Sequence, residues 1–332
     1  MTTVKLMRAI RVAEFGGPSV LKLYSDIPAP SPGQKQNAEL HGKSITAPGI
    51  NSDLCLWSEP SRNLHSVWIL CAKASASVYP WIRCFWSYRG CWGWSSVSSA
   101  TETGGYAEYA VASEDAVHRL PDSLDFCQGA AIGVPYFTAY RALFHKAHAK
   151  AGETALIHGA SGGVGIAACQ LARAFGLKVL GTAGTVEGME LVLKNGAHQA
   201  FNHRENDYVS KIKEATNGQG VNVIVEMLSN VNLDNDLQML SYGGRVTIVG
   251  CRGPIEINPR DTMIKESSII GVALFFATQE ETAECAAALF AGMEAGWLRP
   301  VVGPKYPLEK ASLAHEDIIN SPGAAGKMVL MM

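Results

Sequence analysis

The sequence predicts an α/β fold built on a doubly wound parallel sheet, and two features of one continuous stretch carry this prediction. From about residue 125 to residue 274, apolar segments suited to buried strands alternate with segments that have helical spacing. A glycine-rich turn connects the first of these strands to the first helix. Apolar strands separated by helices of about 10–15 residues are typical of a parallel sheet that is covered by helices on both faces.

Five apolar segments are predicted to form the buried strands. After the first strand, Gly163–Gly176 has the apolar spacing of a helix and ends at a glycine, a common helix stop. A shorter helix is predicted to begin near Val186 and to end at Asn195 and Gly196. The predicted strands are Glu153–Ala160, Leu177–Gly184, Val221–Leu228, Gly243–Gly250 and Ser267–Leu274.

The first strand-to-helix turn, HGASGGVG, has glycines at positions 159, 162 and 165. Gly159 permits a tight turn, and Gly162 lets backbone N–H groups approach a pyrophosphate because no Cβ is in the way. Gly165 lets the helix pack close to the sheet, and the positive end of the helix dipole then faces the phosphates. The Lys-Ser/Thr pair of a P-loop is absent, so the turn favours a dinucleotide-binding Rossmann fold over a plain tight connection.

The end of the second predicted strand indicates which dinucleotide binds. Enzymes that use NAD place an Asp or Glu there to bind the ribose 2′-hydroxyl. In this chain Gly181–Thr185 contains no carboxylate that would repel a 2′-phosphate, so NADPH is favoured over NAD. Lys178, His203 and Arg204 are the basic candidates for contact with that phosphate.

Composition and charge exclude several other classes. The formal net charge of −2 gives no electrostatic argument for binding nucleic acid, a membrane surface or an acidic substrate. The first residues lack a signal-peptide core and no apolar run suggests a membrane span, so a cytoplasmic location with free thiols is expected. Cys55, Cys71, Cys84 and Cys91 contain no C-x-x-C pair, so no metal site is predicted.

Long stretches on both sides of a central gap match a known family. These stretches are Leu6–Leu23, Gly104–Ala112, Gln128–His145, His158–Thr185, Asn195–Glu205, Ser241–Met263, Lys265–Val272 and Tyr306–Ile318. On these residues the chain resembles the zinc-free quinone oxidoreductases of the medium-chain dehydrogenase/reductase superfamily, the group that includes zeta-crystallin. The match covers residues 1–32 and about 98–332.

The resemblance implies a domain organisation and a reaction. An NADPH-binding Rossmann domain, residues 125–266, would be inserted into a GroES-like catalytic domain, residues 1–124. Residues 267–332 would supply the last strand of the Rossmann sheet and then return to the catalytic domain. The implied reaction is metal-free electron transfer from NADPH to a quinone, in a homotetramer. The resemblance also leaves open a structural crystallin role or binding of AU-rich RNA, although no basic aromatic patch supports RNA.

The resemblance also implies which residues contact NADPH. Ser161, Gly162, Gly163 and Val164 correspond to contacts with the pyrophosphate, and Gly184 and His203 to contacts on the adenosine side. Their expected position at the carboxyl ends of parallel strands favours contact, because ligands bind in that crevice. The corresponding contacts towards the nicotinamide are Asn232, Val249, Gly250, Cys251, Arg252, Val272, Ala273 and Leu274.

The segment between the matching stretches is unusual. Six of the seven tryptophans lie between Trp57 and Trp94, and the resemblance to the family stops near Pro32 and resumes near Ser98. Tryptophan has the single codon TGG, which becomes a glycine codon when it is read one base later. The shifted codons permit GVNPVETYIRSG from Trp57 to Trp68, and this string resembles the missing family segment. We therefore interpret about residues 47–97 as a frameshifted translation within an aberrant stretch, residues 33–97.

The frameshift has two expected consequences. It discards the two-residue alternation that selects the buried face of a strand, and it puts tryptophans where the family has glycines, so this segment is expected to be poorly ordered. The family's quinone-pocket Asn and Tyr would fall at Glu59 and Leu64, neither of which offers an amide or a phenol. Catalytic residues are therefore unknown from the sequence, and quinone turnover by this chain is in doubt.

One competing motif is a Y-x-x-x-K pair, which supplies the general base in short-chain dehydrogenases. Tyr306 and Lys310 have this spacing. Pro307 follows the tyrosine directly and disfavours the helix that this chemistry requires, so the pair is predicted to be structural. The apolar run Ser267–Phe276 is predicted as the last core strand, and the resemblance adds edge-to-edge pairing of this strand between two subunits.

Overall fold

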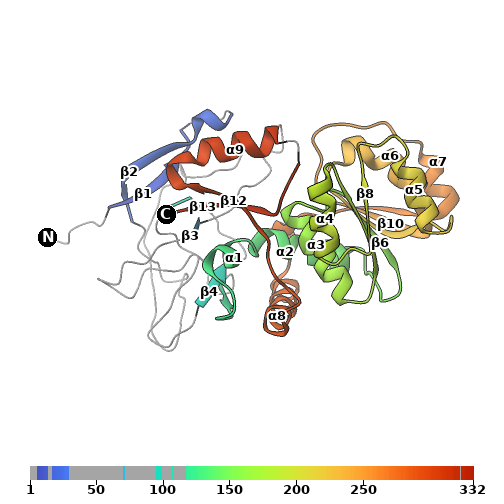
Figure 1. Cartoon of the computed structure of the whole chain (residues 1–332), viewed down its shortest axis with the longest axis horizontal. Helices are drawn as coiled ribbons and strands as arrows, with labels where there is room; N and C mark the ends of the chain where they lie inside the picture. Colours follow the sequence, from blue (N-terminus) through green and yellow to red (C-terminus); the bar gives the residue numbers. More distant parts are fainter. Residues whose placement is uncertain are drawn as a thin grey trace.

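The structure is a computed structural model of the 332-residue chain. It describes residues 6–13, 17–29, 70–71, 95–98, 106–107, 117–321 and 323–332. The described ribbon forms two lobes, with α2 and α8 between them (Figure 1). The frameshift proposed for about residues 47–97, with Glu59 and Leu64, lies outside the described residues except for two short strands, β3 (Leu70–Cys71) and β4 (Ser95–Ser98).

One lobe contains a parallel sheet of six described strands, which confirms the predicted α/β class. The strand order is β11-β10-β9-β6-β7-β8, and every neighbouring pair is parallel. In chain order this is the doubly wound arrangement 3-2-1-4-5-6. The strands are β6 (Thr154–Ile157), β7 (Lys178–Ala183), β8 (Gln199–Asn202), β9 (Val221–Glu226), β10 (Leu240–Ile248) and β11 (Ser268–Gly271).

Alternate residues of the central strands enter two different cores. In β6, Ala155 and Ile157 pack on one face of the sheet, whereas Leu156 packs on the other. Both faces are buried, so the central strands have no polar alternation and appear as continuous apolar runs in the sequence. Prediction of these strands succeeded for that reason. β8 was not predicted, because it has only four residues and lies at the end of the sheet.

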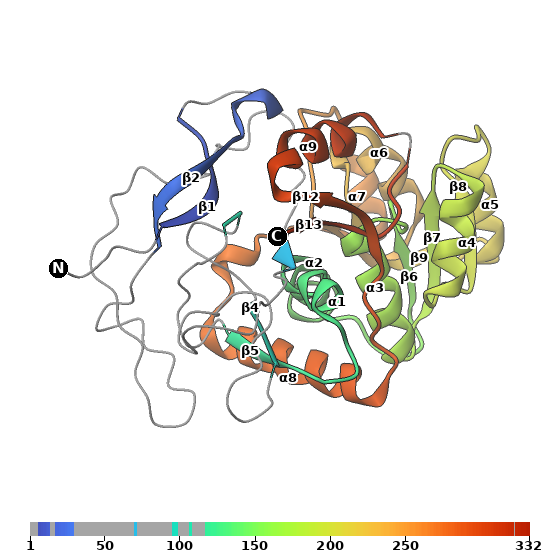
Figure 2. The ribbon, with the colours of Figure 1, turned by 60° about the vertical axis from the view of Figure 1, so that its left-hand side comes forward.

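Helices cover both faces of the sheet. Residues of α2, α3 and α8 share the first core with β6 and β9, and residues of α5 and α6 share the second (Figure 2). A π-helical segment, Arg141–Lys146, continues α2. The helices of this lobe and its surroundings are α2 (Gly133–Tyr140), α3 (Gly163–Ala174), α4 (Val186–Lys194), α5 (Tyr208–Ala215), α6 (Ser229–Met239), α7 (Pro259–Lys265) and α8 (Gln279–Ala295).

The second lobe combines the two ends of the chain. Ile10 from the first strand shares a buried core with Leu308, Ala311 and Val329 near the C-terminus. β1 pairs with β2 antiparallel, β13 lies between β12 and β3, and β4 pairs with β5. The elements are β1 (Leu6–Arg11), β2 (Lys22–Pro28), β5 (Val117–Leu120), α1 (Phe126–Ala130), β12 (Val302–Pro307), α9 (Ala311–Asn320) and β13 (Lys327–Met331).

Two details of the C-terminal third bear on the sequence predictions. The last sheet strand is shorter than the predicted Ser267–Leu274, because the chain forms a 3-10 turn at Leu274–Phe276. The structural interpretation of Tyr306 and Lys310 is confirmed: Tyr306 lies in β12 and donates a hydrogen bond of 2.6 Å to Asp317, while Lys310 ends a 3-10 turn. In the ranges described above, no helix has the length and apolarity needed to cross a membrane.

Candidate cofactor site

The predicted cofactor residues lie along one edge of the sheet. They follow the carboxyl ends of β6, β7, β8, β10 and β11, or lie on α6 just after β9. Parallel strands place all these ends at the same edge, where ligands of doubly wound sheets bind. The structure therefore brings together, from six chain segments, residues that the sequence separates by more than a hundred positions.

The glycine-rich turn has the geometry that close approach to a phosphate requires. Gly159 has a φ of 55°, the left-handed region that favours glycine. A Cβ on Gly165 would lie 2.5 Å from Ala160 Cα and from Gly159 O, so α3 packs against the sheet at a distance that only glycine allows. The first N–H groups of α3, from Gly163 and Val164 onwards, have no carbonyl partner within the helix and can bind an anion.

The second lobe contacts this turn directly. Gly326 donates its N–H to Ser161 O at 2.9 Å and forms a β-bridge with Gly162. A Cβ on Gly163 would lie 3.3 Å from Lys327 Cδ, so the buried lysine stem passes beside the start of α3. Figure 2 shows β12 and β13 beside α3. The glycine-rich turn therefore lies at the junction of the two lobes.

The end of β7 has basic neighbours. A Cβ on Gly184 would lie 2.9 Å from both Arg204 Nε and His203 Nε2. Lys178, the third basic candidate, begins β7 at the opposite edge, where its ammonium donates to Ala215 O at 2.7 Å. His203 and Arg204 therefore lie beside Gly184, whereas Lys178 lies at the other end of β7.

Burial, His158 and Arg204 together hold the pKa of His203 below its usual range. The free imidazole is therefore mostly neutral at neutral pH. A phosphate dianion bound beside it would favour the charged form, because an opposite charge within a few ångströms raises the pKa of a histidine. Binding of a 2′-phosphate is thus expected to be accompanied by proton uptake at His203.

The residues predicted to contact the nicotinamide lie after the ends of β9, β10 and β11. Asn232 on α6 donates its amide to Glu226, and Arg252 N donates to Asn230 Oδ1 at 2.8 Å. Cys251 is exposed, and hydrogen bonds with Ser229 and Gly253 lower the pKa of its thiol. The other predicted contacts, Val249, Gly250, Val272, Ala273 and Leu274, continue from β10 and β11.

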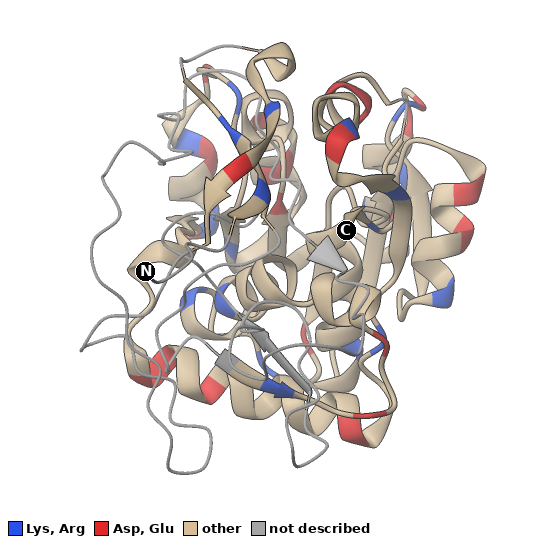
Figure 3. Cartoon of the chain, turned by 90° about the vertical axis from the view of Figure 1, so that its left-hand side faces the viewer, with Lys and Arg blue, Asp and Glu red and all other residues tan. Residues whose placement is uncertain are grey.

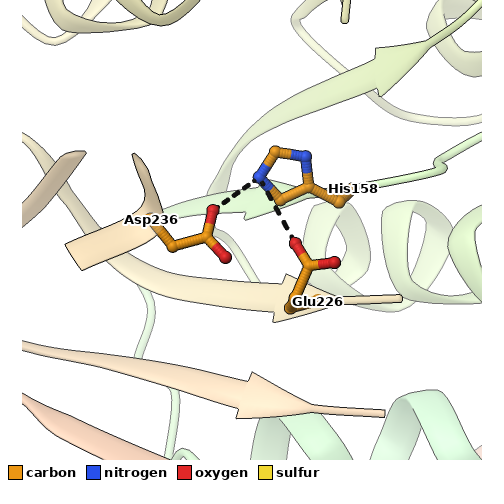
Figure 4. A group of neighbouring side chains, drawn as sticks. All are labelled: His158, Glu226 and Asp236. Atoms are coloured by element: carbon orange, nitrogen blue, oxygen red, sulfur yellow. Dashed lines mark hydrogen bonds and ion pairs between the residues drawn. The ribbon is translucent and has the colours of Figure 1, made fainter. Parts of the chain in front are cut away.

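A buried ionisable cluster lies beneath these contacts, and sequence reasoning missed it. His158 Nε2 lies 2.9 Å from Asp236 Oδ1 and 3.7 Å from Glu226 Oε2 (Figure 4). Its Nδ1 is 3.2 Å from Thr182 Oγ1. Glu226 and Asp236 are completely buried. The one sequence signal for this cluster was the carboxylate of Glu226 at the end of an otherwise apolar strand.

The charges in this cluster compensate one another. Burial alone would lower the pKa of His158, but the carboxylates of Asp236 and Glu226 raise it above the usual value. Burial raises the pKa of Glu226 to about 7, against the opposing effect of the His158 charge. The short contact from Nε2 to Asp236 is a hydrogen bond. Ligands of a tetrahedral zinc ion at about 2.0–2.1 Å from the metal lie further apart than this, so the arrangement fits a shared proton better than a metal.

Comparison with known proteins identifies the relatives. Residues 163–292 match the family described as "Zinc-binding dehydrogenase". A quinone oxidoreductase from Sus scrofa is 57% identical over 333 residues, which cover 100% of this chain and 99% of the relative. The human quinone oxidoreductase is 54% identical over 339 residues, with the same coverage. The crystal structure of Escherichia coli quinone oxidoreductase complexed with NADPH has a TM-score of 0.73 and 27% identity, covering 97% of this chain and 99% of that one.

The sequence resemblance, the strand order and these relatives all indicate the same protein family. The full-length identity lies far above what a shared fold alone would produce, and the structural match extends over both lobes. The chain belongs to the quinone oxidoreductase family.

Proposed function

We propose that this chain is an NADPH-dependent quinone reductase that needs no metal for electron transfer. The observation that carries the proposal is the end of β7, where His203 and Arg204 flank Gly184 in place of the carboxylate of NAD enzymes. When bound, NADPH supplies the reducing equivalents, and the protein contributes binding, orientation and electrostatics. The E. coli relative with an NADPH complex supports this choice of cofactor.

Three groups of residues hold the cofactor in this proposal. Ser161 to Val164 offer backbone N–H groups and bare glycines to the pyrophosphate, and Gly184, His203 and Arg204 surround the adenosine phosphate. The nicotinamide would lie against Asn232 and the ends of β10 and β11. These last contacts are Val249, Gly250, Cys251, Arg252, Val272, Ala273 and Leu274.

We further propose the three-part organisation of residues 1–124, 125–266 and 267–332, with the quinone between the lobes. The shared core of Ile10 with Val329 and the Gly326–Ser161 contact support a catalytic lobe formed from both chain ends. In this proposal Glu59 and Leu64 occupy the quinone-pocket positions, and the alternative is an isoform that binds NADPH with impaired catalysis.

A homo-oligomer, with the family tetramer as its form, and a cytoplasmic location complete the proposal. β11 is the last strand of the described sheet, and the apolar side chains of Ile269, Phe275 and Phe276 beside it are exposed, Phe276 at 80%. An edge strand with exposed apolar residues favours pairing with a second copy. AU-rich RNA binding finds no such support: acidic and basic segments are interspersed on the face in Figure 3.

The test is turnover by the purified full-length chain. NADPH oxidation is followed by absorbance with a series of quinones, with and without a metal chelator. Quinone-dependent oxidation that the chelator does not change is the expected result. Binding of NADPH without turnover by any quinone would support the impaired isoform. Loss of turnover with the chelator would contradict the metal-free reaction.

A further inference from the structure

Glu226 joins the two segments that are expected to contact the nicotinamide. Its side chain accepts hydrogen bonds from Asn232 Nδ2, at 3.1 Å to Oε1 and 3.3 Å to Oε2, and from Leu228 N. Its backbone carbonyl accepts from Val249 N at 2.9 Å and from Gly250 N at 3.2 Å. One completely buried residue at the end of the central strand β9 therefore holds both α6 and the loop after β10.

The other side of the cluster ties the same helix to the pyrophosphate turn. Asp236 lies one helical turn after Asn232 on α6, and its Oδ1 is 2.9 Å from His158 Nε2. His158 directly precedes Gly159 in the glycine-rich turn. The helix is thus held at two points, by Asn232 to Glu226 and by Asp236 to His158, the second of which is drawn in Figure 4.

We propose that Glu226 is a positioning residue for NADPH, which orients the Asn232 amide on the nicotinamide side of the site. The inference rests on the proposed function, because it assumes that Asn232 contacts the cofactor. An ionised carboxylate only accepts hydrogen bonds, so it must face the NH₂ group of the Asn232 amide. The amide oxygen is then the group left to accept a hydrogen bond from a ligand.

The orientation of the Asn232 amide depends on the charge of Glu226. A protonated Glu226 could donate to the amide oxygen, which would allow the Asn232 amide to rotate and present NH₂ to the ligand instead. The ionisable groups that act on Glu226 are His158, just after β6, and Asp236 from α6, and the charge of Glu226 in turn raises the pKa of Tyr208 of α5. His203, after β8, faces His158 in turn.

Burial and these neighbours put the pKa of Glu226 near neutral pH, where binding can be measured on either side of it. Burial raises its pKa to about 7, against the His158 charge that lowers it, while Asp236 raises it further. Above that pH Glu226 is ionised and the amide is held. As pH falls through about 7, the protonated fraction rises and the orientation of Asn232 is lost.

The experiment compares two ligands in the full chain. NADPH carries the nicotinamide, whereas 2′-phospho-ADP-ribose carries the same phosphates and adenosine without it. Their dissociation constants are measured for the unaltered chain and for Glu226→Gln, between about pH 5.5 and 8.5. Glu309→Gln, an exposed carboxylate of the second lobe, is the matched control.

The inference expects a loss confined to NADPH. Glu226→Gln should weaken NADPH binding about tenfold at alkaline pH, while binding of 2′-phospho-ADP-ribose stays unchanged, and the ratio of the two affinities in this variant should no longer depend on pH near neutrality. In the unaltered chain, the ratio of the two affinities should fall below about pH 7. The control should behave as the unaltered chain.

Other outcomes overturn the inference. If Glu226→Gln weakens the binding of both ligands equally, Glu226 has a general structural role. If it weakens the binding of neither, Glu226 does not position the cofactor. If the variant fails to fold, the affinity ratio in the unaltered chain decides, and a ratio that is constant with pH overturns the inference. Failure of the unaltered chain to bind 2′-phospho-ADP-ribose would instead overturn the proposed function, and this inference with it.

Discussion

Two buried groups of ionisable side chains, one in each lobe, respond to burial in opposite ways. In the sheet lobe, His158 lies between the carboxylates of Asp236 and Glu226, and these raise its pKa. In the second lobe, His315 lies 2.9 Å from the hydroxyl of Tyr106, and Lys327 acts on it through its charge. Burial and Lys327 lower the pKa of His315 to about 4.

The difference shows that the sign of the neighbouring charge decides whether the pKa of a buried histidine rises or falls. Burial also lowers the pKa of Lys327, to about 7, so this ammonium loses its proton far more readily than that of an exposed lysine. In the first group, the carboxylates favour the charged form of His158, and the His158 charge opposes the rise that burial causes in the pKa of Glu226. The first group adjoins the proposed cofactor contacts, and the second lies where the lobes meet.

The largest expected effect comes from removing the histidine at the centre of the sheet cluster. His158→Ala leaves two buried carboxylates without a counter-charge, which should lower the free energy of unfolding by about 3–5 kcal/mol at neutral pH. Chemical denaturation measures this loss. The double change His158→Ala with Asp236→Ala should recover part of it, and a single variant as stable as the unaltered chain would contradict the charge compensation.

The second largest effect is expected in the glycine-rich turn, where a substitution can weaken NADPH binding without lowering the stability of the fold. A Cβ on Gly162 would lie 3.4 Å from Gly159 O and 3.5 Å from Ala324 Cβ, both ordinary contacts. Gly162→Ala should therefore fold normally, yet weaken NADPH binding about a hundredfold by blocking approach of the pyrophosphate. Calorimetric titration checks the affinity. Gly17→Ala, which has open space around it, is the control and should leave binding unchanged.

A smaller effect is expected in the second lobe. Lys327 binds a proton up to about pH 10.5 when unfolded but only below about pH 7 when folded, so its contribution to stability rises with pH between these values. Lys327→Met removes this titration and should flatten the rise of stability with pH. Thermal unfolding of both chains at several pH values measures the slope, and an unchanged slope in the variant would contradict the assignment to Lys327.

The smallest predicted effect concerns cofactor choice at the end of β7. Arg204→Ala should weaken NADPH binding about tenfold and leave NADH binding unchanged, because only NADPH carries the 2′-phosphate. Lys178→Ala removes a basic side chain from the other end of the same strand and serves as the control. An equal loss for both nucleotides would indicate that Arg204 supports the fold rather than the phosphate.

The sequence predicted the elements that depend on local pattern. The buried strands around Leu156 and Ile224 are continuous apolar runs, and the glycine spacing at 159, 162 and 165 specifies the turn that the structure contains. β8 escaped prediction, since four half-exposed residues at the end of a sheet have no strong pattern.

The ionisable groups could not be predicted because they depend on long-range contacts. His158 and Asp236 are 78 positions apart, and Tyr106 and His315 are 209 apart. The position of His203 and Arg204 beside Gly184, away from Lys178, likewise depends on the strand direction of β7, which places Lys178 at the other end of the strand. No local spacing carries that information.

The most direct test of the account is a calorimetric comparison of NADPH and NADH binding to the unaltered chain. Backbone N–H groups at the start of α3, with His203 and Arg204 beside Gly184, predict that NADPH binds at least about tenfold more tightly than NADH. Equal affinities, a preference for NADH, or no binding of either nucleotide would contradict it.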